Sequence, residues 1–117
     1  MGCGCGLIGS LVISPGSVSP VYSNPVPRGG EAAIFSLEVL ELNATVNLEI
    51  SLEHKNRGDT SWGTLISLAP ISATGVESKH VTGVKELCRV VAQFGTGTSS
   101  SDTARIASMN WSWLPYA

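Results

Sequence analysis

The chain has 117 residues, a net charge of −2 and a charged fraction of only 14%, which fits a single domain. Its seven Lys and Arg residues are scattered, so we expect no basic face for nucleic acid, and no apolar run is long enough to span a membrane. So few charges on a small domain predict that part of its surface is covered by other protein chains.

Residues 1–30 are rich in Gly, Ser and Pro and predict an extended arm, because each Pro holds the preceding residue extended. No Lys or Arg precedes Arg28, so the basic start of a secretory signal is missing and we expect synthesis in a cytosol. The arm is too apolar for a solvated tail and needs a surface, either on its own domain or on a neighbouring subunit. A short strand is expected at residues 7–13. The residues expected to contact a partner are Leu7, Ile8, Leu11, Val12, Ile13, Val18, Val21 and Tyr22.

Residues 31–117 predict a β-sandwich domain that begins with two alternating segments. In residues 31–42 the apolar residues occupy both faces, as a buried strand requires. Residues 45–53 alternate strictly, which places one face on a core and the other in water. The inward residues expected in this second segment are Val46, Leu48, Ile50 and Leu52.

The remaining segments continue the β pattern. A polar hairpin loop is expected at residues 54–62, followed by strands at residues 62–68, 75–81 and 87–94. A flexible loop is expected at residues 95–102, before a last strand at residues 105–114 with Ala107, Met109, Trp111 and Trp113 on one face. The sequence therefore predicts an all-β fold, an antiparallel β-sandwich of jelly-roll or immunoglobulin-like type, with six to eight strands and an extended N-terminal arm.

The three cysteines do not form a recognisable metal or lipid site. Cys3 and Cys5, with Cys88 and one of the two histidines, would give four soft ligands, but the spacing lacks the two paired knuckles of a structural zinc site. Myristoylation requires Ser or Thr where this chain has Gly6. We therefore expect no metal, no other cofactor and no membrane anchor. The Arg57-Gly58-Asp59 tripeptide is interpreted as an ordinary hairpin turn.

No group of residues has the spacing of a catalytic motif. Most carboxylates, Asp102 among them, fall on outward strand positions or loops, and His54 and His80 each adjoin a Lys on exposed turns. We therefore expect no catalytic residues and no enzymatic activity.

The tryptophans are the most informative aromatic residues. Trp111 and Trp113 share one strand face and are expected in the core, the alternative being a platform on which sugar rings stack. Trp62 and Tyr116 are possible aromatic contacts to a partner.

Four segments carry a resemblance to a known class of proteins. They are residues 48–62 (LEISLEHKNRGDTSW), 74–76 (TGV), 84–91 (VKELCRVV) and 113–116 (WLPY). In this order they resemble small β-sandwich virion proteins of tailed bacteriophages, of the capsid decoration, cement or minor structural kind. The resemblance covers residues 31–117 and leaves out the arm with Cys3 and Cys5.

The resemblance implies a non-enzymatic virion structural protein, made in the host cytoplasm, that stabilises or decorates a phage capsid. Its expected partners are the major capsid protein or other virion proteins, and it is expected to form homo-oligomers that gain from avidity on a lattice. Nucleic acid and membrane are not expected partners. The alternative is a β-sandwich module that binds carbohydrate or a host surface.

Overall fold

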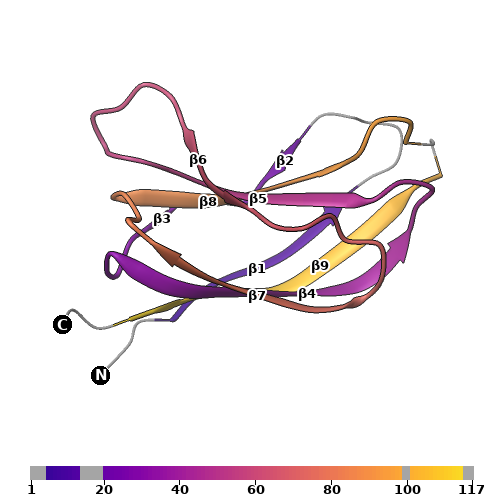
Figure 1. Ribbon diagram of the computed structural model, residues 1–117, viewed down its shortest axis with the longest axis horizontal. Coiled ribbons are helices and arrows are strands. Elements are labelled where there is room, and N and C mark those ends of the chain that lie inside the picture. Colours follow the sequence, from indigo (N-terminus) through magenta and orange to yellow (C-terminus); the bar gives the residue numbers. More distant parts are fainter. Residues whose placement is uncertain (1–4, 14–19, 99–100, 115–117) are drawn as a thin grey trace.

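The computed structural model describes residues 5–13, 20–98 and 101–114, with the backbone alone at residues 5–13. These ranges contain nine strands and no helix, so they hold no helix that could cross a membrane. The strands form two antiparallel sheets that pack face to face (Figure 1). This arrangement confirms the predicted all-β antiparallel sandwich. The number of strands agrees with six to eight when the two-residue strands β2 and β3 count as halves of one edge strand.

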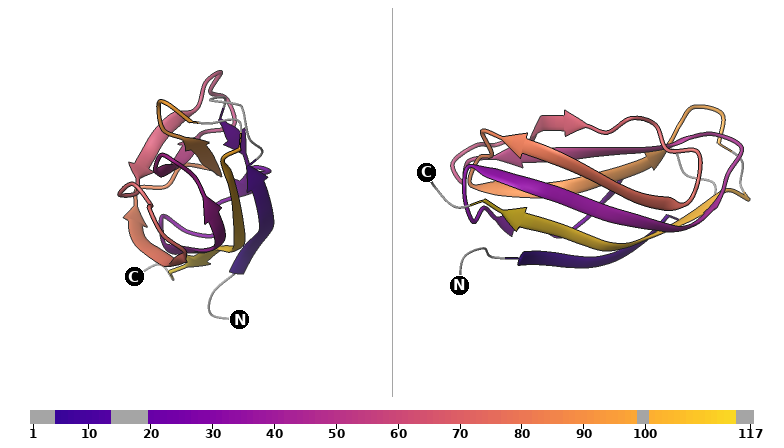
Figure 2. Two further views of the ribbon diagram at one scale, coloured as in Figure 1. Left: turned by 90° about the vertical axis from the view of Figure 1, so that its right-hand side faces the viewer. Right: turned by 60° about the horizontal axis from the view of Figure 1, so that its bottom comes forward.

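The first sheet has the order β1-β9-β4-β7. Its strands are β1 (Cys5–Ile13), β9 (Thr103–Trp113), β4 (Ala32–Asn43) and β7 (Gly75–Thr82). In the second sheet β2 and β3 both pair with β8, which is followed by β5 and β6. The strands of this sheet are β2 (Val21–Tyr22), β3 (Val26–Pro27), β8 (Leu87–Phe94), β5 (Leu48–Lys55) and β6 (Gly63–Ser67). The end-on view in Figure 2 shows the two sheets as separate layers.

The core follows from strict alternation along the central strands, because successive side chains of a strand point to opposite faces. The core residues of these strands are Ala33, Phe35, Leu37 and Val39 in β4, Leu48, Ile50 and Leu52 in β5, and Cys88, Val90, Ala92 and Phe94 in β8. The β9 residue Trp111 is fully buried, stacked on Trp113 at 5.5 Å between ring centroids and tilted against Phe35 at 4.9 Å. The prediction that both tryptophans belong to the core is confirmed.

The last strand contains a β-bulge that changes which residues face the core. Two steps along β4 from Ser36 to Glu38 match three steps along β9 from Asn110 to Ala107, and Ser108 has a φ of 55°. The buried residues are therefore Ala104 and Ile106 before the bulge, and Met109, Trp111 and Trp113 after it. The prediction that Ala107 shares the inner face was wrong, because the bulge shifts the alternation by one residue.

Asp102, expected in a flexible loop, is 2% exposed at the start of β9. Its Oδ1 accepts the backbone N–H of Thr45 at 3.1 Å, and its Oδ2 accepts the hydroxyls of Thr45 at 3.0 Å and Thr98 at 2.9 Å. A buried carboxylate needs such donors to replace lost hydration. Asp102 therefore ties the β4–β5 connection to the β8–β9 connection. The predicted loop is present, since residues 95–98 and 101–102 contain no strand, but Asp102 is buried and anchored within it.

The N-terminal segment lies on its own domain, which is one of the two surfaces considered for the predicted arm. β1 pairs with β9 along its length, so the strand expected at residues 7–13 is present as Cys5–Ile13. Farther along, the Ser23 hydroxyl accepts the backbone N–H of Val90 at 2.8 Å, and Arg28 donates to the carbonyl of Val84. Gly29 passes so close to Trp113 that a Cβ at this position would lie 2.6 Å from the indole ring. Residues 5–13 and 20–29 therefore close one edge of each sheet.

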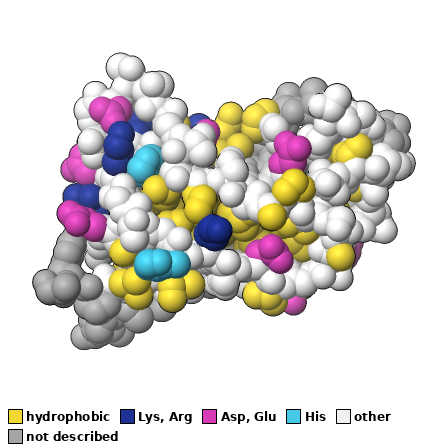
Figure 3. All heavy atoms as spheres, in the orientation of Figure 1, with side chains coloured by type: hydrophobic (Ala, Val, Ile, Leu, Met, Phe, Trp, Pro, Cys, Tyr) yellow, Lys and Arg dark blue, Asp and Glu magenta, His cyan; other side chains and the backbone are white. Residues whose placement is uncertain are grey.

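The opposite side of the sandwich, between β6 and β7, is less completely closed. Leu65, Ile66 and Leu68 pack against the core there but remain half-buried. Figure 3 shows this side of the molecule, with a band of hydrophobic side chains across its middle.

Candidate functional site

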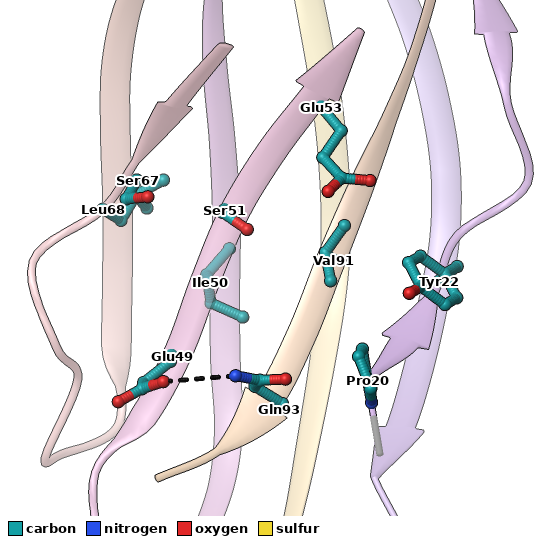
Figure 4. Close-up of a pocket in the computed structure, with 10 residues that line it drawn as sticks. All are labelled: Pro20, Tyr22, Glu49, Ile50, Ser51, Glu53, Ser67, Leu68, Val91 and Gln93. Atoms are coloured by element: carbon teal, nitrogen blue, oxygen red, sulfur yellow. Dashed lines mark hydrogen bonds between the residues drawn. The ribbon is translucent and has the colours of Figure 1, made fainter. Parts of the chain in front are cut away.

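A groove of about 370 Å³ crosses the outer face of the second sheet, over β5 and β8 (Figure 4). Its floor exists because residues 48, 50 and 52 of β5 are buried, so that the odd-numbered residues between them point outward. The sheet register places three outward pairs in succession, Glu49 with Gln93, Ser51 with Val91 and Glu53 with Arg89. We call this hollow the second-sheet groove.

The middle of the second-sheet groove pairs the apolar Val91 with the polar Ser51, and its sides are formed by the neighbouring strands. Val91 points outward yet is only 7% exposed, and its register partner in β2 is Tyr22. Pro20 and Tyr22 form one side, and Ser67 and Leu68 form the other (Figure 4). The groove therefore offers a floor of one apolar and one polar residue between two polar ends.

One end of the groove is rigid. Arg89 contacts the Oε1 atom of Glu53 through both Nη2 at 2.7 Å and Nε at 2.9 Å. Its guanidinium also lies over two aromatic rings, 4.0 Å from the ring centroid of Tyr22 and 4.3 Å from that of Trp62. Because both cationic contacts use Oε1 of Glu53, Oε2 keeps its capacity to accept hydrogen bonds from a ligand.

The other end of the groove is looser. The Gln93 side-chain amide donates to Oε1 of Glu49 at 3.4 Å, in an exposed contact near the upper limit for a hydrogen bond. Such a contact is easily exchanged for one to a ligand. The two ends therefore differ, with a paired charge at Glu53 and an exposed carboxylate beside an amide at Glu49.

A second hollow of about 340 Å³ lies beside the β5–β6 hairpin and is lined in part by His54, Asp59 and Lys85. The Nδ1 atom of His54 accepts the backbone N–H of Lys85 at 3.2 Å. Burial, and then the positive charge of Lys85, lower the pKa of His54 below its usual 6.5. His54 therefore holds the hairpin to the β7–β8 turn only in its neutral form.

We expect the contribution of His54 to stability to depend on pH. Its pKa is lower in the folded than in the unfolded chain, so the unfolded chain binds more protons as the pH falls below 6.5. Wild-type protein should therefore lose stability below pH 6.5 more steeply than a His54→Gln variant, measured as the urea midpoint between pH 8 and pH 5. The exposed His80 supplies the control variant His80→Gln, which should follow the wild type. Parallel curves for wild type and His54→Gln would contradict this role.

The Arg57-Gly58-Asp59 tripeptide lies at the exposed tip of the β5–β6 loop. Oδ2 of Asp59 accepts the backbone N–H of Asn56 at 2.9 Å, and the backbone N–H of Arg57 donates to Glu86 at 3.0 Å. These bonds fit the interpretation of the tripeptide as a hairpin turn.

The structure brings together only some of the predicted contact residues. Val21 is half-buried against the core, whereas Tyr22 is 47% exposed and borders the groove. Trp62 is half-buried, with Lys55 and Arg89 over its ring. Five of the predicted contact residues lie in β1, where the structure describes only the backbone: Leu7, Ile8, Leu11, Val12 and Ile13. Val18 and Tyr116 lie outside the described residues.

The one cysteine side chain that the structure describes is chemically inert. Cys88 is fully buried, and burial raises its pKa to about 12, so the thiol is protonated at neutral pH. Among the side chains that the structure describes, those of residues 20–98 and 101–114, no cluster of three or more His, Cys, Asp or Glu residues could hold a metal ion. Cys3 lies outside these ranges.

Comparisons with protein-family models, curated proteins and solved structures found no match to this chain. The groove residues Glu49, Ser51, Glu53, Val91 and Gln93 were not singled out as a site by sequence reasoning. The alternation of β5 and β8 identifies them as outward residues, but their pairing depends on the register between two strands 39 positions apart (Leu48 to Leu87).

Proposed function

We propose that the chain is a non-enzymatic virion structural protein, which binds the major capsid protein or another virion protein through strand β1 at the edge of the first sheet. The sequence resemblance to phage virion proteins supports the virion setting. The observation that carries the assembly role is a difference between the two edges of the first sheet. One edge is protected against strand addition and the other is not.

The protected edge is β7. Lys79 and Glu77 lie directly across from the core residues Phe35 and Leu37 of β4, so they share the inner face of the sheet. Charged residues that point inward on an edge strand prevent a second chain from covering that edge, because the charges would be buried. β7 is therefore a poor place for a partner strand.

The unprotected edge is β1. Its nine residues contain no charged residue and no proline, and the sheet order leaves one side of β1 without a neighbouring strand among the described residues. An uncharged edge of this length presents a row of backbone donors and acceptors that a partner strand can pair with. β1 is therefore the strand where we place the partner.

The outer face of the same sheet suits a protein contact. Ile34, Leu40 and Val76 are 43%, 44% and 67% exposed. In the sheet register Val76 lies beside Glu38, and Ile34 lies beside Ser112 of β9 and His80 of β7. Exposed apolar side chains of this kind are typical of a protein interface.

Leu7→Lys tests the edge directly, because a lysine on an exposed edge strand opposes strand pairing. The register partner of Leu7 is Asn110, which lies outside the core, so the fold should survive. Full-length wild type should form concentration-dependent oligomers in size exclusion with light scattering, and Leu7→Lys should shift them to monomer. The matched control is Thr64→Lys on β6 of the other sheet, which should oligomerise like the wild type.

The virion role is tested separately by immunogold labelling with antibodies against the full-length chain. Particles released from cells that carry the gene should be labelled on the capsid. Label confined to cell debris would overturn the proposal. So would a wild type that is monomeric at all concentrations and a Leu7→Lys variant that labels particles as strongly as the wild type.

A further inference from the structure

We propose that the second-sheet groove binds a neutral, hydroxyl-rich ligand, a glycan segment of about two sugar rings. This inference goes beyond the assembly role, which uses the first sheet. It rests on three features of the groove, namely its chemistry, its length and its charge.

The chemistry of the groove matches a sugar ring, which has apolar C–H faces and a rim of hydroxyls. Val91 supplies the apolar part of the floor beside Ser51, and the 47% exposed Tyr22 supplies an aromatic side. Hydroxyls are donors and acceptors, and the ends of the groove hold groups that complement both. Glu49 accepts, and the Gln93 amide both donates and accepts.

The dimensions are those of a small oligosaccharide site. Glu49 and Glu53 stand four residues apart on one strand, which is about 13 Å at 3.3 Å per residue. The volume of about 370 Å³ lies near the lower end of the range for small-molecule sites. A short saccharide laid along β5 and β8 would therefore reach both polar ends.

The charge of the groove favours a neutral ligand over an anionic one. The cation at the site, Arg89, is already paired with Glu53 at 2.7 Å and stacked between Tyr22 and Trp62. Glu49 adds a carboxylate at the opposite end. Phosphates, nucleic acids and acidic sugars would therefore meet the negative charge of Glu49 and no cation free to pair with them.

The rigid end also explains why the site is formed before a ligand arrives. The aromatic pair and the Glu53 carboxylate hold Arg89 from three directions, so the Oε2 acceptor of Glu53 is fixed in place. Only the weak contact between Gln93 and Glu49, at 3.4 Å, must open. A preorganised site binds more tightly because less ordering is lost on binding.

The test uses the labelled full-length chain on an array of neutral and acidic glycans, followed by titration calorimetry with maltose, cellobiose and diacetylchitobiose. We expect a neutral glycan to bind, and Ser51→Phe, which fills the floor, to weaken that binding at least tenfold. Gln93→Ala should also lower the affinity for the glycan. The matched control Thr82→Phe, which places the same ring on an exposed position of β7, should bind like the wild type.

Nuclear magnetic resonance with the bound sugar should shift the amide signals of Glu49, Ser51 and Gln93. Absence of binding to every neutral glycan would overturn the inference, as would binding that Ser51→Phe leaves unchanged. Binding of spermidine in place of sugar, lost in Glu49→Gln and weakened by salt, would show that the groove takes cations and would also overturn it. None of these outcomes bears on assembly through β1, which Leu7→Lys tests.

Discussion

Replacing Trp111 by alanine should lower the free energy of unfolding by about 4 kcal/mol, in the range measured for large aromatic residues removed from protein cores. Trp111 is fully buried, lies at the inner face of the first sheet and contacts the rings of both Phe35 and Trp113. Its removal leaves a cavity that the rigid neighbouring strands cannot fill. This loss is a large part of the total free energy of unfolding of an ordinary domain, so the variant should be close to unfolded.

Chemical denaturation followed by far-ultraviolet circular dichroism measures this effect, and two variants provide comparison. Trp111→Phe should cost much less, because it keeps an aromatic ring in the core and removes an indole Nε1 that is buried without a hydrogen-bond partner among the described residues. Trp62→Ala removes an equally large ring from a half-buried position outside the core and should cost about 1 kcal/mol, the size of its cation–π contacts. Equal losses for Trp111→Ala and Trp62→Ala would show that the core is not centred on Trp111.

The central strands could be predicted from the sequence because their alternation depends only on neighbouring residues. The predicted strand at residues 87–94 coincides with β8, and the inward residues Leu48, Ile50 and Leu52 of β5 are those expected. The bulge at Ser108 was missed, because a positive φ at a serine has no local sequence signal and is imposed by pairing with β4.

The buried position of Asp102 was missed for a similar reason. A Gly- and Ser-rich segment is typical of a flexible loop, and nothing near Asp102 in the sequence reveals that Thr45, 57 positions away, donates to it. The groove shows the same limit. Its polar ends could be predicted as outward residues of their strands. The contacts of Arg89 with Tyr22 and Trp62 could not, because they join three distant segments of the chain. The alternation along one strand predicts which face of the sheet a residue occupies. A site also depends on which strands pair side by side, and distant parts of the sequence decide that.

Deleting residues 1–28 should lower the free energy of unfolding by at least about 5 kcal/mol, which is enough to unfold many domains of this size. The deletion removes β1, β2 and β3, and so exposes the edge of β9 in one sheet and of β8 in the other. It also removes the Ser23 hydroxyl that accepts the N–H of buried Val90, and the Arg28 contact to Val84. Each inter-strand hydrogen bond contributes about 1 kcal/mol net, and a buried donor left without a partner costs about 1–3 kcal/mol.

Thermal and urea unfolding of the chain from residue 29 onward tests this prediction, with deletion of residues 1–4 as the control because it removes no residue of a described strand. The control should unfold like the full chain, and the long deletion should be unfolded or aggregated. A long deletion that unfolds at the same urea concentration as the full chain, yet no longer oligomerises, would show that the N-terminal segment serves assembly alone. Because Leu7→Lys keeps both sheets complete, its effect on oligomers separates the role of the β1 edge from the contribution of the segment to folding.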